Sequence, residues 1–165
     1  MFISKWWGEY FGGTDDGMVL TDYFAKGETA QYTLAGILSD FNVSTQESFD
    51  GFRSTDNKDI RYIIEDKFHA DIDLAINLLL YLAIITLESL KSGSVPLAAL
   101  TDCDSHNKQF AISVDKDTLG YLVNILKDFC ENHLEYDLAE MCDEETMSEI
   151  ASQCKEVVSE LEKEL

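Results

Sequence analysis

The sequence predicts a mainly α-helical, α+β protein: a helical bundle around a buried central helix at about residues 71–92, with a small antiparallel β-hairpin at about residues 97–115. Three observations lead to this fold class. Residues 74–85 are apolar except for Asn77 and are rich in Leu and Ala, which favour helix. Apolar residues alternate at the end of the hairpin segment, as in a strand. In residues 115–165, apolar residues recur at the three- and four-residue spacing of a helix.

The predicted central helix has apolar side chains on all its sides, so we expect it to be buried nearly all round. Asp71 and Asp73 suit the start of this helix. Lys91 suits its last turn, and Gly93 suits the position just after its end. The apolar run covers 12 residues, whereas a membrane-spanning helix needs roughly 20. We therefore expect the core helix of a soluble domain and no membrane partner.

Shorter elements precede the central helix. Aromatic residues recur every four positions in residues 1–13, which is helical spacing, and a glycine pair ends that stretch. We expect a helix at residues 18–25 and a short helix at residues 29–41, within which residues 31–35 could instead form a strand. Residues 42–58 are polar and are predicted to form a loop.

Residues 58–67 are predicted to form a helix directly before the central one. The prediction rests on apolar side chains three and four positions apart, which would face the core together. These side chains are Ile60, Ile63, Ile64 and Phe68. After the central helix, strands at residues 97–101 and 109–115 are predicted to form the hairpin, joined by a turn at residues 102–108.

Two helices are predicted for the C-terminal third. Asp115 can cap the first, which ends near residue 134, and residues 135–142 either continue it or break it briefly. Asp143 can cap the last helix, whose outer face is mostly acidic. We find no internal repeat and no long linker, so residues 1–165 are expected to form a single domain.

The net charge is the most informative value of the composition. The chain has 32 acidic and 12 basic side chains, a net charge of -20, and its only arginines are Arg53 and Arg61. Such a surface repels nucleic acid and anionic lipid, so no direct nucleic-acid partner is expected. It attracts a basic protein, although solubility alone is an alternative explanation.

Cysteine usage and the first residues predict the compartment. Four cysteines in 165 residues are too few for a disulfide scaffold. The first residues lack the apolar segment and the small-residue cleavage site of a signal peptide. We therefore expect a cytoplasmic protein with reduced thiols. No nucleophile elbow, P-loop or other catalytic constellation occurs, so we expect neither enzyme activity nor a cofactor.

Two Cys-x-x-His pairs supply the residue types of a Cys2His2 zinc site. They are Cys103 with His106 in the predicted turn, and Cys130 with His133 on a predicted helix. The spacing between the pairs is unfamiliar, and Cys130 also lies on an apolar stripe, where a buried thiol is common. We therefore expect a structural role for these residues and no metal.

An acidic stretch in the same predicted turn has part of the pattern of a calcium-binding loop. Asp102, Asp104 and His106 alternate as the first ligands of an EF-hand do. The sixth position is Asn107 where glycine is needed, and the twelfth is Ser113 where glutamate belongs. The pattern therefore does not predict calcium binding.

The C-terminal segment is the most acidic part of the chain. Residues 115–165 hold 15 acidic residues and four lysines, a net charge of -11 in 51 residues, against -9 in the other 114. A solvated helix face is the simpler interpretation. The functional interpretation is an array of carboxylates, placed like the phosphates of a nucleic acid, that binds a basic protein. The residues predicted to contact the partner are Asp128, Glu131, Glu135, Asp137 and Glu140, then Asp102 and Asp104.

The N-terminal segment resembles the opening of a known protein family. The run WGEYFGGTDD at residues 7–16, followed by Leu20 and Tyr23, is similar to the start of small acidic immunity proteins of bacterial toxin systems. These are the cognate inhibitors of contact-dependent growth inhibition and of related polymorphic toxins. The resemblance implies a stoichiometric inhibitor that covers the active site of a toxin C-terminal domain, often a nuclease with a basic substrate groove.

Two alternatives belong to other classes of protein. One is an acidic adaptor or regulatory protein, including a nucleic-acid mimic that blocks a DNA-binding protein. The other is a small enzyme or metal-binding protein that uses the two Cys-x-x-His pairs. The genomic neighbourhood separates the first alternative from an immunity protein, and metal analysis of the purified protein separates the second.

Overall fold

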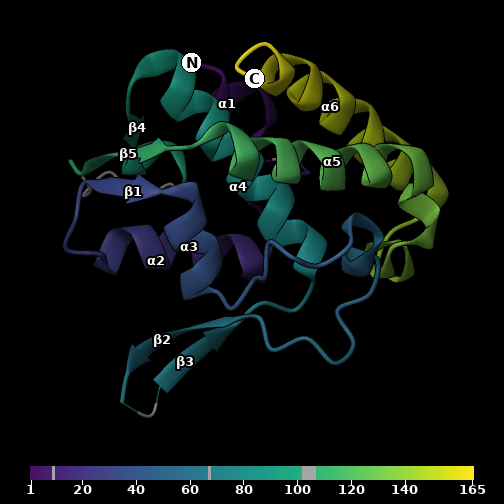
Figure 1. The fold of residues 1–165 in the computed structure, drawn as a ribbon, viewed down its shortest axis with the longest axis horizontal. Helices are drawn as coiled ribbons and strands as arrows, with labels where there is room; N and C mark the ends of the chain where they lie inside the picture. Colours follow the sequence, from purple (N-terminus) through teal and green to yellow (C-terminus); the bar gives the residue numbers. More distant parts are fainter. Residues whose placement is uncertain (9, 67, 102–106) are drawn as a thin grey trace.

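Helix α4 (Ala75–Ser92) runs through the centre of the protein (Figure 1). The computed structural model describes residues 1–8, 10–66, 68–101 and 107–165. Every residue from Ala75 to Ser89 is buried, which confirms the predicted core helix. By length and composition α4 could cross a membrane, but 83% of it lies inside the protein. Packing within the protein therefore accounts for its apolar residues.

The start of α4 differs from the predicted start at Asp71. Asp71 ends a strand, and no side chain at the first residues of α4 caps the helix. The carboxylate of Asp16 instead accepts hydrogen bonds from the backbone N–H groups of Asp73 and Leu74, at 2.7 and 3.1 Å. The backbone N–H groups at the start of α4 are thus bound by a residue distant in sequence and not by a capping side chain next to the helix. Gly93 follows the helix with a φ of 79°, as predicted.

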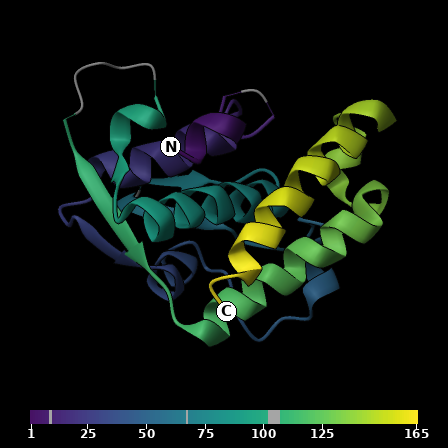
Figure 2. The ribbon, with the colours of Figure 1, turned by 90° about the horizontal axis from the view of Figure 1, so that it is seen from above.

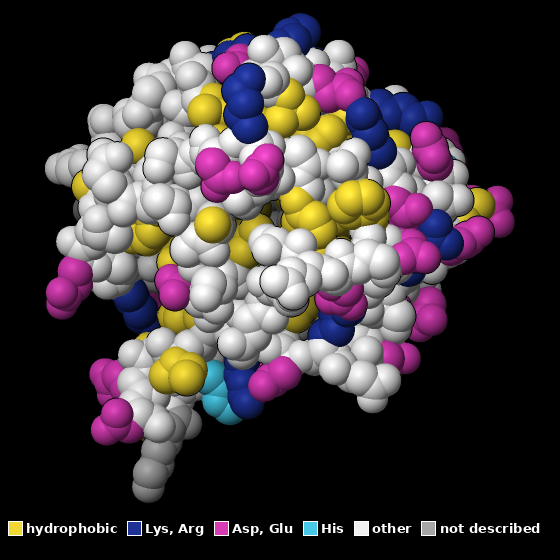
Figure 3. All heavy atoms as spheres, viewed as in Figure 1, with side chains coloured by type: hydrophobic (Ala, Val, Ile, Leu, Met, Phe, Trp, Pro, Cys, Tyr) yellow, Lys and Arg dark blue, Asp and Glu magenta, His cyan; other side chains and the backbone are white. Residues whose placement is uncertain are grey.

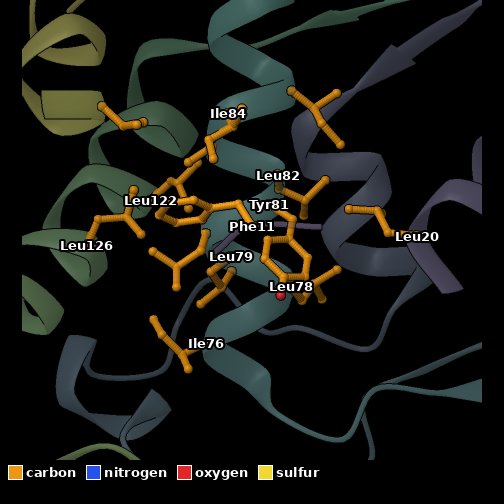
Figure 4. Packing of buried hydrophobic residues seen from close by; sticks show 14 of the residues in the cluster. Phe11, Leu20, Ile76, Leu78, Leu79, Tyr81, Leu82, Ile84, Leu122 and Leu126 are labelled. Atoms are coloured by element: carbon orange, nitrogen blue, oxygen red, sulfur yellow. The ribbon is translucent and has the colours of Figure 1, made fainter. Parts of the chain in front are cut away.

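Further helices surround α4. They are α1 (Ile3–Trp6), α2 (Asp15–Lys26), α3 (Leu34–Asp40), α5 (Lys116–Asn132) and α6 (Glu144–Glu162). Helices α5 and α6 pack along each other (Figure 2). Figure 4 shows Leu122 and Leu126 of α5 on one side of α4, and Leu20 of α2 on the other. The central helix is therefore enclosed by elements from both halves of the chain.

The C-terminal helices begin as predicted. Asp115 and Asp143 cap α5 and α6, because each side chain accepts a hydrogen bond of 2.8 Å from the backbone N–H three residues later. Two 3-10 helices, η3 (His133–Glu135) and η4 (Asp137–Glu140), separate α5 from α6. Residues 135–142 therefore break the helix and do not continue it.

The N-terminal aromatic stretch contains less helix than predicted. Helix α1 has four residues, and Gly8, with a φ of 105°, turns the chain after it. The backbone N–H of Ile3 donates to the carboxylate of Glu88 in α4 at 2.8 Å, and Ser92 Oγ donates to the same carboxylate at 2.5 Å. Because Glu88 is only 1% exposed, this contact fixes the start of the chain to the core helix.

A three-stranded sheet with the order β1–β5–β4 packs against α4. Strand β1 (Gln31–Thr33) runs parallel to β5 (Gln109–Ser113), and β4 (Val95–Pro96) runs antiparallel to β5. The second strand of the predicted hairpin is confirmed, and so is the strand alternative within residues 31–35. The parallel partner of β5 was not predicted.

The predicted first strand of that hairpin, at residues 97–101, is wrong. Leu97–Ala99 forms the 3-10 helix η2, and the strand that pairs with β5 is β4, directly before it. Leu97 and Leu100 are both buried. Their three-residue spacing fits a 3-10 turn and not the two-residue alternation of a strand.

The predicted helix at residues 58–67 is also wrong. Strand β2 (Arg61–Glu65) pairs antiparallel with β3 (Phe68–Asp71), and this hairpin projects from the body (Figure 1). Ile60 and Tyr62 are buried two residues apart, as in a strand, while Ile63 is 75% exposed. The 3-4 spacing of apolar residues was therefore coincidental, because most of those side chains do not enter the core.

Candidate functional site

Two hollows among the described residues show no feature of a known active site. One of about 300 Å³ lies beside α2 and is lined by Gly12, Met18 and Leu100 among others. Another, of about 420 Å³, lies between α1 and α6. Neither is lined by a histidine or a cysteine, which are the commonest general base and a common nucleophile of active sites. The molecular surface is therefore the better place to look for a site.

An acidic surface lies where α5 ends and α6 begins. Residues 128–154 contain nine acidic side chains and neither lysine nor arginine. The 3-10 helices η3 and η4 pack against each other, and η3 also packs against α6, which brings this stretch together. Figure 3 shows acidic side chains along the right-hand margin of the molecule, where Figure 1 places this junction.

We call this surface the acidic end. It consists of the exposed acids Glu131, Glu135, Glu140, Glu144 and Glu145 and of two exposed apolar side chains of the same stretch, Leu134 and Met141. Leu134 is 51% exposed and Met141 is 75% exposed. Within the described part of the chain, all of these acids except Glu135 are without an ion pair. Exposed apolar side chains together with charged ones are typical of a protein–protein interface.

An ion-pair network lies just beneath the acidic end. Arg53 Nε and Nη2 donate to Asp128 Oδ2 and Oδ1 at 2.9 and 2.6 Å, a two-pronged pairing. Arg53 also pairs with Glu135, and Tyr136 Oη donates to Asp128 Oδ2 at 2.7 Å. The hydrogen bonds from Arg53 hold the pKa of Asp128 below its ordinary value and keep it ionised. The network neutralises the basic side chain that would otherwise interrupt the acidic surface.

Asp137 binds the backbone of the segment that carries Arg53. Its Oδ2 accepts a hydrogen bond of 2.7 Å from the backbone N–H of Thr55, and its own N–H donates to the carbonyl oxygen of Arg53 at 2.8 Å. The 3-10 helix η1 (Phe49–Phe52) and the residues after it are thereby held against α5. Asp137 thus has an internal role.

The acids predicted as contact residues fall into two groups, those that bind inside the molecule and those that are exposed. Asp128 and Asp137 bind inside the molecule, and the side chain of Asp128 is only 17% exposed. Glu131 and Glu140 are exposed, and Glu135 is exposed while it also pairs with Arg53. Asp102 and Asp104 lie outside the described residues. No observation tests whether any of these residues contacts a partner, so that remains a prediction.

The zinc hypothesis depended on two Cys-x-x-His pairs, of which Cys103 and His106 also lie outside the described residues. Cys130 is buried between α5 and α6, with its Sγ 3.7 Å from the carbonyl oxygen of Ala151. Burial raises the pKa of the neighbouring Cys154 thiol. Among the described residues, no three or more His, Cys, Asp or Glu side chains are grouped to hold a metal ion. Cys130 is thus a packing residue of the α5–α6 contact.

A second exposed surface, on the β2–β3 hairpin, was missed by the sequence analysis. Ile63 and Phe68 are 75% and 68% exposed, although both were expected to face the core. Figure 3 shows hydrophobic side chains open to solvent on this projection, next to a histidine. The buried pair Ile60 and Tyr62, two residues apart, was the signal that favours a strand here.

Comparison with known families agrees with the resemblance of the N-terminal segment. A family model described as Immunity protein 68 matches residues 2–161. No curated protein and no solved structure matches the chain. Because the match covers nearly the whole chain, the protein belongs to the immunity protein 68 family, and the expectation of a bacterial immunity protein is confirmed.

Proposed function

We propose that this member of the immunity protein 68 family neutralises its cognate toxin by covering a basic substrate groove, most simply that of a nuclease, with the acidic end. Membership of the family supports action against a toxin protein. The observation that carries the finer proposal is the acidic end itself. Four exposed carboxylates without an ion pair among the described residues share a stretch without lysine or arginine with two exposed apolar side chains.

The chemistry of a nuclease groove is complementary to this surface. A groove that binds a phosphate backbone presents lysine and arginine side chains, and these attract carboxylates as they attract phosphates. The net charge of -20 steers such a partner toward the protein before contact, most strongly at low ionic strength. Leu134 and Met141 would then be buried in the complex and slow its dissociation.

The acids of the proposed contact surface fall into two groups. Glu131, Glu140, Glu144 and Glu145 are available to pair with the toxin, and Glu135 can do so while it holds Arg53. Asp128 acts as a positioning residue, because it binds the side chain of Arg53 and so holds the segment after η1 in place. The protein acts by binding, without catalysis and without a cofactor, and we place it in the cytoplasm, where a delivered toxin would act.

The test is to measure association with the C-terminal domain encoded by the gene directly upstream. We expect a tight one-to-one complex that abolishes the activity of that domain, with an association rate that falls steeply with salt. The variant Glu131→Lys/Glu140→Lys should slow association by roughly tenfold at low salt. The control is Asp117→Lys/Glu156→Lys, which reverses two exposed acids outside both the acidic end and the β2–β3 hairpin and makes the same change in net charge.

Two results would refute the proposal at different levels. If the wild-type protein does not bind or inhibit the upstream product, the assignment of this toxin is wrong, and capture of a DNA-binding protein would favour a nucleic-acid mimic. If the toxin binds but both double variants associate at the same rate, the toxin contacts another surface.

A further inference from the structure

The β2–β3 hairpin exposes apolar side chains that the fold does not use. Ile63 and Phe68, the two large ones, are 75% and 68% exposed, and Ile64 is 37% exposed. A hollow of about 570 Å³ separates β2 from the end of α2, so the hairpin stands away from the body (Figure 1). Single exposed apolar residues are common, but several on one projection indicate a binding surface.

The exposed side chains lie on both faces of the hairpin. Ile63 pairs with His69, and Phe68 pairs with Glu65, whereas Tyr62 pairs with Ala70. Opposite residues of an antiparallel pair share a face, and so do residues two apart in one strand. Phe68 is therefore on the face of Ala70 and Tyr62, and Ile63 is on the other face. A flat partner would cover one of these side chains, whereas a cleft would cover both.

The backbone of the hairpin is a poor template for an added strand. The register shifts between Ile63 and Glu65, which is a β-bulge in the middle of β2. Bulges twist an edge strand and interrupt its row of hydrogen-bonding groups, which opposes pairing with another chain. The side chains and not the backbone are then the groups that can bind a partner.

The base of the hairpin is held firmly, so the projection has a defined direction. Tyr62 Oη donates to Asp22 Oδ2 at 3.0 Å, and the Tyr62 ring lies 5.4 Å from the rings of Tyr23 and Phe41. The backbone N–H of Ile72 also donates to the carbonyl oxygen of Ile60 at 2.9 Å. Little conformational freedom is left to lose when the projection is bound, which favours affinity.

The charge of the protein indicates what covers the hairpin. A second copy would carry the same net charge of -20 and would be repelled. Glu65 and Asp66 at the end of β2 are exposed and form no ion pair with any described residue. A positively charged protein with a partly apolar cleft is thus the complementary partner.

We infer that the β2–β3 hairpin is a second docking element, which inserts Ile63 and Phe68 into a cleft of the toxin domain while Glu65 and Asp66 meet basic groups at its rim. This inference rests on the proposed function for the identity of the partner. It adds a contact surface that is separate in sequence from the acidic end and that works by apolar burial.

The experiment uses the double variant Ile63→Ser/Phe68→Ser, which removes the apolar groups without changing the net charge. We expect its complex with the upstream-encoded toxin domain to dissociate roughly tenfold faster or more, with little change in the association rate. The matched control is Met18→Ser, an exposed apolar residue of α2 that is 63% exposed in the free protein. Circular dichroism and the unfolding midpoint establish that both variants remain folded.

The outcomes separate this inference from the proposed function. Binding by the wild type with unchanged dissociation of the hairpin variant would overturn the hairpin inference and leave the acidic end in place. A wild type that does not bind the toxin domain would overturn both. A wild-type homodimer that the hairpin variant converts to monomer, measured by analytical ultracentrifugation, would show that a second copy occupies the surface, and would also overturn the inference.

Discussion

The acidic end and the β2–β3 hairpin are both exposed, but different interactions hold them in place. The acidic end is continuous with α5 and α6, and a network around Arg53 ties it to the loop after η1. The hairpin is attached through Tyr62 and Ile60 at its base, and its far end contacts little. Substitutions beneath the acidic end and at the base of the hairpin should therefore affect stability, whereas substitutions of the exposed side chains of the hairpin should affect only binding.

The largest expected effect is on the network beneath the acidic end. Asp128→Ala removes the acceptor of the buried Tyr136 and one of the two carboxylates that bind Arg53, and should lower the free energy of unfolding by about 1.5–3 kcal/mol. Glu131→Ala, three residues later on an exposed position, is the control and should change it by less than about 0.5 kcal/mol. Urea titrations of both variants make the comparison, and equal midpoints would show that the network does not stabilise the fold.

The pH dependence of stability tests the contribution of Asp128 separately. The pKa of Asp128 lies below its ordinary value of 3.8, chiefly because Arg53 donates to it. A lowered pKa in the folded state gives stability that is present above pH 3.8 and is lost as pH falls through the lowered value. Asp128→Asn should therefore lose less stability than the wild type between about pH 4 and pH 2. If the free energies of unfolding of the variant and the wild type fall in parallel with pH, the ionised Asp128 does not stabilise the fold.

The attachment of the hairpin should contribute less. Tyr62→Phe keeps the buried ring but removes the hydrogen bond to Asp22, so the free energy of unfolding should fall by about 1 kcal/mol. Amide exchange in β2 and β3 should become faster, while exchange in α5 should stay unchanged. Equal acceleration in both regions would mean that the hairpin opens only with the whole protein.

The smallest effect is expected at the hairpin surface. Phe68→Ser removes a side chain that is 68% exposed, so the unfolding free energy should change by less than about 0.5 kcal/mol. A thermal melt of the free protein checks this value. A large loss would mean that Phe68 packs against the body in solution, which would remove it from the docking surface.

Elements that are determined by one continuous stretch of chain could be predicted from the sequence. The apolar run of α4 was recognised without other information, and Gly93 and Asp143 mark helix ends by their own chemistry. The start of α4 was misplaced because its backbone donors bind Asp16, a residue that local capping rules do not reach. The spacing of Ile60, Ile63 and Ile64 imitated a helix in a segment that pairs as strands.

The charge of the surface could also be predicted, but not which acids are available for binding. Residues 115–165 were correctly identified as the densest in negative charge. The contact between Arg53 and Asp128 joins residues 75 positions apart, and no local pattern indicates it. Glu144 and Glu145 were not among the predicted contact residues, whereas the fold places them at the start of α6, on the same acidic end as Glu131 and Glu140.

The contact between Ile3 and Glu88 has a practical consequence. The backbone N–H of Ile3 is the donor that the buried carboxylate of Glu88 needs. A purification tag or fused reporter that pulls the first residues away would leave this carboxylate short of a donor inside the protein. Labels for pull-down or imaging should accordingly be attached after Leu165, which is 40% exposed.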